Sequence, residues 1–381
     1  MIRMISAGES HGKEITVILE GVPAGLHVNP AQINAELRRR QGGYGRGKRM
    51  QIETDEAEIL SGVRDGKTIG SPIALRIKNR DYENWRGRMN VGALTIDDPV
   101  TAPRPGHADL SGVLKFGLND VRNVLERASA RETAARVAAG AIMKQLLSEF
   151  GVSLSSRTIS IGGIETKETL RSAAEIETSP LRCADPQQEK LMIERIDAAA
   201  NKGDTLGGVS EIVATGVCPG LGTYTQWDLR LDSKIAAAMM SIPSVKSVSI
   251  GERTINKTVG SSAQDEIFFN EKRGFYRAGN HAGGIEGGMT NGEDIIVYIY
   301  IKPLPSLRSP LQTADIRTGK PVAAQKERAD VCVVPAAGVV GEAMLALAVT
   351  DALLEKFGSD SLADIKTNYQ NYLSRICKTL S

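Results

Sequence analysis

The sequence predicts a mixed α+β fold in which helices and sheets pack as a sandwich, and two features of the chain predict it. Strand-like and helix-like segments interleave without the strict βαβ rhythm of a doubly wound parallel sheet. The helical stretch 120–150 also contains a run of small residues at 134–141 (AARVAAGA). Because small side chains let a second backbone approach closely, we expect this helix to lie at the centre of the fold.

Four segments are predicted to be strands from their β-branched content: 15–19, 73–77, 209–217 and 295–301. The last, within DIIVYIYIK, is the clearest. Its nearly continuous apolar run predicts burial on both faces.

Helices are predicted at 30–41, 120–150, 187–200 and 342–357. The first has Pro30 in its opening turn and ends in three arginines before Gly42, and the second ends at Gly151. The polar segment 166–186 is interpreted as a surface insertion. No repeat, low-complexity tract or Ser/Pro-rich linker divides the chain, so we expect one domain, 1–381.

Composition excludes several classes of protein. The 381 residues are 41% hydrophobic, enough for a sizeable core, and the net charge of +2 is too balanced for nucleic-acid or membrane binding by bulk charge. No apolar run is long enough to span a bilayer, and the N-terminus has no signal-peptide core. The four cysteines form no CxxC pair, so no metal site is expected and a cytoplasmic location is favoured.

Three of the four histidines lie in glycine-bearing segments: His11 in GESHG, His107 in RPGHAD and His281 in GNHAGG. Histidine commonly transfers protons near neutral pH, and glycine lets the backbone pass close to a ligand. We therefore expect His11 and His107 to act as acid–base groups. A solvated loop ring is the alternative for any single one of them, and His27 is interpreted as structural.

Arginines gather where an anion could be bound, because guanidinium groups bind phosphate and carboxylate oxygens in pairs. They crowd around the glycines of 42–47, precede His107, flank 128–130 and precede residue 330; the residues are Arg38, Arg39, Arg40, Arg46, Arg49, Arg104, Arg127, Arg131 and Arg328. Arg38 and Arg49 are interpreted as solvated charges, and Arg46, between glycines, as a ligand-binding group. The glycine-rich segment 279–292 is a further candidate for cradling a phosphate or a flavin edge.

Three short matches favour other functions. GESHG fits the nucleophile elbow of serine hydrolases, with Ser10 as nucleophile, but an elbow at residue 8 leaves no earlier strands for the required sheet. Residues 42–49 nearly fit a P-loop, but Arg49 replaces the hydroxyl residue and the segment follows a helix. The same run could bind RNA, yet Tyr44 is its only stacking aromatic.

Ten long motifs, in family order over nearly the whole chain, resemble chorismate synthase. They are SAGESHG (6–12), RRQGGYGRGKRMQIE (39–53), GSPIAL (70–75), RPGHADLSG (104–112), DVRNVLERASARETAARVAAGA (120–141), GDTLGGV (203–209), PGLGTYTQWDLRLD (219–232), NHAGGIEGGMTNGE (280–293), KPLPS (302–306) and ERADVCVVPAAGVVGEAM (327–344).

The resemblance implies a βαβ sandwich, with a helical layer between two antiparallel sheets, and a homotetramer. It implies an anti 1,4-elimination of phosphate from 5-enolpyruvylshikimate-3-phosphate to give chorismate, with no net redox change but with a requirement for reduced FMN. Electron density from the reduced flavin is thought to help expel phosphate, and the flavin N5 then takes up the hydrogen.

The resemblance also assigns residues. His11 would protonate the departing phosphate, His107 would lie near flavin N1, and Asp330 would relay the proton near N5. Substrate binding would fall to Ser10, Arg40, Arg46, Arg104, Ser129, Arg131 and Arg328. FMN contacts would come from Ala128, Ser129, Ala130, Gly287, Lys302, Pro303, Leu304, Pro305, Ser306 and Arg328. Pro243 and Ser244 match a further FMN contact, one that a neighbouring subunit often makes in the family, and the sequence leaves open which subunit supplies it.

Some family features are left open by the sequence. Bifunctional members assign positions such as Arg40 and Arg46 to NADPH as well, while monofunctional members depend on an external reductant, and no GxGxxG segment follows a strand here. Ala329 stands where the family often has serine, Ser306 stands where it often has threonine, and SAGE replaces TAGE. These small changes affect fine geometry only.

Overall fold

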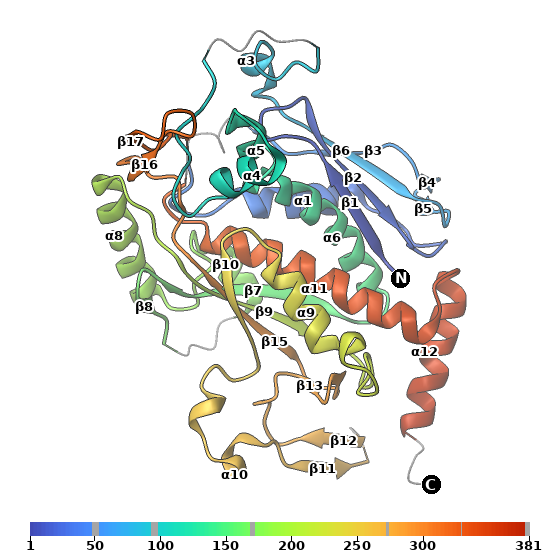
Figure 1. Cartoon of the computed structure of the whole chain (residues 1–381). Coiled ribbons are helices and arrows are strands. Elements are labelled where there is room, and N and C mark those ends of the chain that lie inside the picture. Colours follow the sequence, from blue (N-terminus) through green and yellow to red (C-terminus); the bar gives the residue numbers. More distant parts are fainter. Residues whose placement is uncertain (48–52, 93–97, 168–171, 272–273, 329, 378–381) are drawn as a thin grey trace.

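The computed structural model describes residues 1–47, 53–92, 98–167, 172–271, 274–328 and 330–377 (Figure 1). Within these ranges the prediction of a mixed α+β fold is confirmed. Helices alternate irregularly with strands, and the strands of the two larger sheets pair antiparallel throughout.

The first sheet has the spatial order β1 (Arg3–Ala7), β2 (Glu14–Glu20), β6 (Ile73–Lys78) and β3 (Ala57–Ile59). The strands predicted at 15–19 and 73–77 are therefore confirmed. Alternate residues of β2 and β6 are buried, as expected for a sheet with one face on the core. The loop between β1 and β2 carries His11.

The second sheet has the order β10 (Val245–Ile250), β15 (Ile295–Ile301), β9 (Gly208–Thr215), β7 (Ser153–Ile161) and β8 (Ile164–Glu165). The limits predicted for β15 are confirmed, but burial on both of its faces is wrong. Its residues alternate between buried and half-buried, with Ile296, Tyr298 and Tyr300 on the half-buried face, beside the charged pair of Glu211 and Arg157 on neighbouring strands. There the Tyr298 hydroxyl donates to Glu211 at 2.7 Å.

Three helices pack on one another beside these sheets: α1 (Pro30–Gln41), α6 (Thr133–Ser148) and α11 (Val334–Phe357). Helix α6 contacts β2 and β6, whereas α11 contacts β7, β9 and β15 (Figure 1). The two helices also pack on each other, and a Cβ added to Gly140 would lie 2.4 Å from the Cβ of Ala343. The small-residue run is thus buried at a close helix–helix contact, which confirms its predicted central place.

Helix α11 differs from its prediction in two respects. It begins at Val334, eight residues before the predicted start at Glu342. By length and composition alone it could also cross a membrane, contrary to the expectation that no apolar run was long enough. However, 89% of its most apolar window is buried inside the protein, which is typical of a core helix.

The predicted helix 120–150 is wrong as a single element. It divides into α5 (Arg122–Leu125), one 3-10 turn, η1 (Ala130–Glu132), and α6. The break occurs because Ser129 is extended, with its hydroxyl accepting from the Arg131 N–H. The side chain of Glu126 is likewise directed across to the β1–β2 loop.

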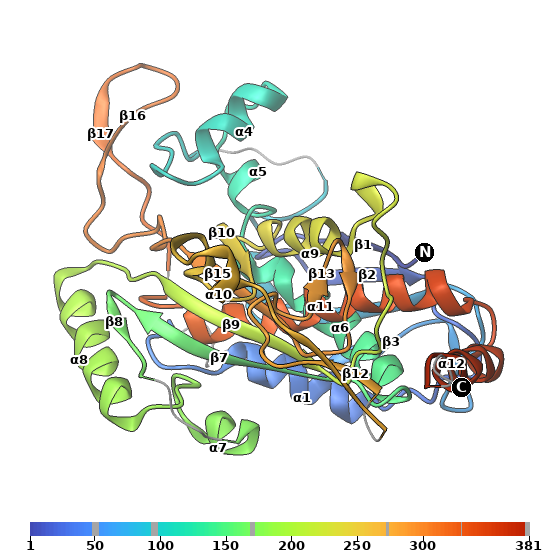
Figure 2. The same cartoon turned by 90° about the horizontal axis from the view of Figure 1, so that it is seen from below.

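The remaining elements surround this core (Figure 2). They are β4 (Val63–Arg64), β5 (Lys67–Thr68), α3 (Tyr82–Trp85), α4 (Asp109–Phe116), α7 (Ala173–Thr178), α8 (Pro186–Lys202), η2 (Trp227–Leu229), α9 (Leu231–Met240), η3 (Ile255–Lys257), α10 (Gly260–Ala263), β11 (Ile267–Asn270), β12 (Gly274–Arg277), β13 (Ile285–Glu286), β14 (Met289–Thr290), β16 (Gln312–Ala314), β17 (Pro321–Ala323) and α12 (Leu362–Cys377).

Helix α8 confirms the prediction for 187–200 within two residues at either end. The surface insertion predicted at 166–186 is wrong in its second half, because Leu181 and Cys183 are fully buried in the main core. Residues 168–171 of that segment lie outside the described residues. Helices α9 and α12 were not predicted.

Replacement of Gly140 by alanine should push α6 and α11 apart, since the new Cβ would overlap the backbone and side chain of Ala343. We expect a loss of about 1–3 kcal/mol in the free energy of unfolding, the usual cost of overpacking. Urea denaturation measures this difference. Gly260→Ala is the matched control, because a Cβ there would meet nothing within 4 Å; equal stability of the two variants would contradict the close contact.

Candidate active site

The loop between β1 and β2 presents Ser10 and His11, which are 3% and 6% exposed. The loop turns at Gly8, whose φ of +109° favours glycine and where a Cβ would lie 2.3 Å from the Glu14 carbonyl oxygen. Two backbone N–H groups then fix the loop to Glu126. Ser10 donates to its carbonyl at 3.0 Å, and His11 donates to Oε2 at 2.8 Å.

The His11 ring is held on its edge and on its face. Nδ1 lies 2.8 Å from Oε1 of Glu126, and the ring stacks on Trp85 with centroids 4.0 Å apart. Burial raises the pKa of Glu126, but the hydrogen bonds from His11 outweigh burial and hold the pKa below its usual range. The Ser129 hydroxyl donates to Ser10 Oγ at 3.1 Å. Ser10, His11 and Ser129 therefore lie together.

Asp55 joins two of the predicted arginines. Its carboxylate accepts from Arg131 at 2.6 and 2.7 Å and from Arg40 at 3.2 Å, and all three side chains are buried. The Nε of Arg131 donates to Asn79, and that of Arg40 donates to Thr133, each at 2.8 Å. The two guanidinium groups are thus immobilised by the chain itself.

Arg46 and Asp330 extend this cluster. The Nε of Arg46 lies 3.5 Å from Oδ2 of Asp330, and the Gly47 N–H donates to Oδ1 at 2.6 Å. Burial lowers the pKa of Arg40 to about 10; the charges of Arg131 and Arg46 also lower it, whereas Asp55 and Asp330 raise it. Arg40, Arg46, Arg131 and Asp330 therefore belong to one electrostatic group.

A second group forms at the start of α4. Asp109 accepts from Arg104 Nε at 2.8 Å and lies 2.6 Å from His107 Nδ1, while Arg104 donates to Ser306 at 2.6 Å. Burial raises the pKa of Asp109, but hydrogen bonds from His107 and Arg104 outweigh it and hold the pKa well below its usual range. The ammonium of Lys302 donates to the Gly106 carbonyl at 2.5 Å.

The segment 302–306 lies along this second group. A Cβ on Gly106 would be 3.8 Å from Pro305, the Leu304 carbonyl accepts from Thr205 at 2.8 Å, and Pro303 adjoins Gly207. Ser244, with a φ of +71°, accepts from the Lys302 N–H at 2.9 Å. Pro243 and Ser244 therefore lie beside Lys302 of their own chain.

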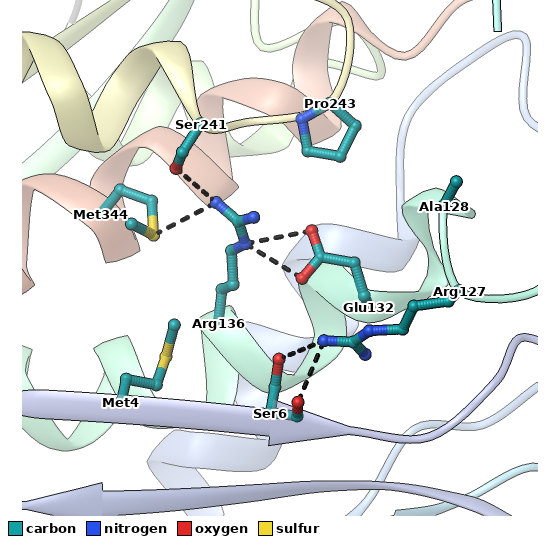
Figure 3. A pocket seen from close by; sticks show the side chains of 9 residues that line it. All are labelled: Met4, Ser6, Arg127, Ala128, Glu132, Arg136, Ser241, Pro243 and Met344. Atoms are coloured by element: carbon teal, nitrogen blue, oxygen red, sulfur yellow. Dashed lines mark hydrogen bonds and ion pairs between the residues drawn. The ribbon is translucent and has the colours of Figure 1, made fainter. Parts of the chain in front are cut away.

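A pocket of about 390 Å³ lies at Ala128 and Pro243 (Figure 3). Its other lining residues are Met4, Ser6, Arg127, Glu132, Arg136, Ser241 and Met344. Arg127 donates to Ser6 from one side, and Arg136 donates to Ser241 and Glu132 from the other (Figure 3). The pocket therefore combines two arginines and one glutamate with apolar side chains such as Met4 and Met344, and it lies within the usual size range of small-molecule sites, roughly 300–1,000 Å³.

Two predicted residues stand apart from these clusters. The side chain of Arg328 is 49% exposed and pairs with Asp81. Gly287 lies at the exposed turn between β13 and β14, where an added Cβ would meet nothing within 4 Å. His281 pairs with Asp265 at 2.7 Å, away from the other histidines.

The short motif matches gain no support from this geometry. The Ser10 hydroxyl accepts from Ser129 at 3.1 Å and His11 Nδ1 is occupied by Glu126, which is not the hydrogen-bond arrangement of a serine–histidine pair. The last two positions of the P-loop-like run, Lys48 and Arg49, lie outside the described residues. Sequence reasoning also missed Asp55, Asp109, Glu126 and Trp85, although Asp109 and Glu126 stand inside quoted motifs.

An α+β fold with buried imidazole–carboxylate and arginine–carboxylate pairs is the framework of an enzyme that binds anions and transfers protons. The comparisons with known proteins identify the family. A sequence model of the family described as chorismate synthase matches residues 2–354. Chorismate synthase of Desulforudis audaxviator is 53% identical, covering 99% of this chain and 98% of its own; that of Carboxydothermus hydrogenoformans is 52% identical, covering 99% of both.

A solved structure gives the same result. A crystal structure of chorismate synthase superposes with a TM-score of 0.81 at 42% identity, covering 99% of this chain and 98% of its own. The chain belongs to the chorismate synthase family.

Asp55→Ala should destabilise the fold, because Arg40 and Arg131 would lose their shared counter-charge inside the protein. We expect a loss of about 3–5 kcal/mol, typical of breaking a buried ion pair. Chemical denaturation gives the value. Glu58→Ala, which removes the exposed partner of Arg76 from the neighbouring strand β3, should have a much smaller effect; a similar loss in both variants would contradict the assignment.

Stability should fall in acid through Asp109. Its folded pKa lies below the unfolded value of about 3.9, so its contribution is present above that pH and is lost as the pH falls toward the folded pKa. Asp109→Asn should therefore lose less stability than the wild type between about pH 5 and pH 2. Urea denaturation across this range measures it. Asp364→Asn, in the exposed first turn of α12, should follow the wild-type curve.

Proposed function

We propose that this chain converts 5-enolpyruvylshikimate-3-phosphate to chorismate by anti 1,4-elimination of phosphate, the last common step of the shikimate pathway. Membership of the chorismate synthase family over nearly the whole chain carries this proposal. The site supports it, since a trianionic substrate calls for several fixed guanidinium groups, and its leaving phosphate calls for a proton donor.

Reduced FMN is the proposed cofactor, and the residues present fit it. A flavin phosphate needs cations. Lys302 is the first residue of the segment 302–306, and Arg104 donates to Ser306 at its end. A flavin ring needs a pocket, and Ala128 and Pro243 line one of about 390 Å³. When bound, reduced FMN would supply the electron density that assists loss of phosphate and would take up the hydrogen at N5. Gly287, at the exposed turn between β13 and β14, would contact a cofactor bound to a neighbouring subunit instead of its own.

In the proposed reaction, His11 donates a proton from Nε2 to the departing phosphate, because Glu126 already occupies Nδ1. Ser10 and Ser129 support the same phosphate through their hydroxyls. Arg40, Arg46, Arg131, Arg104 and Arg328 neutralise the phosphate and the carboxylates. Arg40 and Arg131 are held by the chain before the substrate arrives, so the site needs little reorganisation when the substrate binds.

His107 and Asp330 are proposed to act on the cofactor side. His107 Nδ1 lies 2.6 Å from Asp109 and Nε2 lies 3.3 Å from Nη2 of Arg104, so both neighbours fix the ring that would face the N1 edge of the flavin. Asp330, held by Arg46 and the Gly47 N–H, would relay the proton taken from the substrate. Arg40 and Arg46 would also contact NADPH if the chain reduces its own flavin.

Four further properties are proposed from family membership. The helices α6 and α11, with one sheet on either side, would form the central layer of the family's βαβ sandwich. The chain would act as a homotetramer, and it would work in the cytoplasm as one domain. The buried state of α11 supports a protein core over a membrane span.

An anaerobic phosphate-release assay with chemically reduced FMN tests the function. We expect turnover with reduced FMN, none with oxidised FMN, and turnover with NADPH plus oxidised FMN only if the chain reduces its own cofactor. His11→Ala and His107→Ala should each lower kcat by roughly 10- to 10⁴-fold, the usual loss of one acid–base group.

His27→Ala is the matched control, because His27 is itself exposed and forms a β-bridge with Lys67. Wild-type rates in both active-site variants would remove these histidines from the mechanism. Phosphate release with fully oxidised flavin would contradict the cofactor proposal.

A further inference from the structure

We propose that Glu126 and Trp85 are positioning residues for His11, which hold its ring on the Nδ1 edge and on one face so that Nε2 alone meets the departing phosphate. This inference rests on the proposed function only for the identity of that phosphate. The restraint itself stands on the contacts described below.

Glu126 holds both the ring and the backbone of His11. Its carboxylate, 2% exposed, lies 2.8 Å from Nδ1 and accepts the His11 N–H at 2.8 Å, while its carbonyl accepts the Ser10 N–H. Because an anionic carboxylate can only accept, Nδ1 must carry the hydrogen of that bond. In the neutral ring this leaves Nε2 as an acceptor, and in the protonated ring it leaves Nε2–H as the donor.

Trp85 restrains the ring against rotation. Its indole lies nearly parallel to the imidazole, at 26° and 4.0 Å, and the guanidinium of Arg122 lies 5.0 Å from the same indole. Arg122 also donates to Glu126 at 3.2 Å and to Glu327 at 2.9 Å. One arginine thus fixes both groups that touch His11, and it ties them to the segment that leads to Asp330.

The assembly leaves one atom of the ring available. Among the described residues His11 Nε2 makes no hydrogen bond, although the side chain is only 7% exposed. Trp85 covers a face of the ring from water, and Glu126 covers an edge. A proton on Nε2 is therefore directed at the substrate, and a ring free to rotate would lose that direction.

The test uses the full chain in two independent measurements. For fluorescence, Trp227→Phe removes the exposed second tryptophan, 75% exposed, so that emission comes from Trp85 alone. An imidazole stacked on an indole quenches its emission, most strongly when protonated. We expect His11→Asn in this background to raise the emission, and Glu126→Gln to change it by loosening the ring.

Turnover is then measured with reduced FMN. Glu126→Gln and Trp85→Ala should each lower kcat by about 10- to 100-fold, as expected for a misplaced catalytic group, with a much smaller change in KM. Trp85→Phe should restore most of the rate, because a phenyl ring can still stack on the imidazole. Glu211→Gln, which alters a buried carboxylate paired with Arg157 in the second sheet, should leave kcat unchanged.

The outcomes separate this proposal from the proposed function. If the wild type releases no phosphate, the proposed function is contradicted. The fluorescence measurement then still tests whether Trp85 and Glu126 hold the His11 ring. An active wild type with unchanged kcat in Glu126→Gln and Trp85→Ala, or unchanged emission in His11→Asn, would overturn the proposal. Thermal unfolding of each variant excludes a general loss of fold, and Glu126→Gln, which keeps the size of the side chain, is preferred over alanine for that reason.

Discussion

Buried positive charge is the constraint on which the site depends. A guanidinium or imidazolium removed from water is costly unless a carboxylate compensates it, and breaking such a pair costs several kcal/mol. The chain meets this requirement with a different acid for each cluster: Asp55 between Arg40 and Arg131, Asp109 between Arg104 and His107, and Glu126 beside His11. Asp55 is distant in sequence from Arg131, and Glu126 is distant from His11, so these two pairs also fix separate elements relative to one another. Asp109, by contrast, pairs within its own segment.

The same solution recurs in the core and connects it to the site. Glu342 of α11 is fully buried, yet Arg39 of α1, Lys144 of α6, Arg182 and the Ser156 hydroxyl of β7 all bond to its carboxylate. Burial raises the pKa of Glu342, but the cations around it outweigh burial and keep the group ionised. Arg39 and Arg40 are neighbours on one helix. The network that orients Arg39 therefore also sets the rotation of α1, and with it the direction in which Arg40 points toward Asp55.

The sequence predicted most of the local elements of this arrangement and missed the contacts between distant segments. Periodicity and caps located β2, β6, β15, α1 and α8, because these signals are local. The helix 120–150 was predicted whole, since nothing local shows that Ser129 is extended or that the Glu126 side chain binds His11 across the fold. The histidines and arginines were found because their residue types are rare or clustered. Asp55, Glu126 and Trp85 were missed because an acid or an indole becomes significant only when folding brings a partner from a distant segment.

The pairing also divides the arginines into two kinds. Arg40 and Arg131 each donate from all three nitrogens to the chain, and therefore present only the second N–H of their terminal nitrogens to a ligand in a fixed direction. Arg328, half-exposed and bonded through one nitrogen to Asp81 within the described residues, keeps most of its donors and its freedom. A polyanion would thus meet rigid donors at the inner end and an adjustable one at the mouth. Rigid donors such as those of Arg40 and Arg131 would orient the proposed substrate at little entropic cost, whereas Arg328 keeps the freedom to adjust to a ligand.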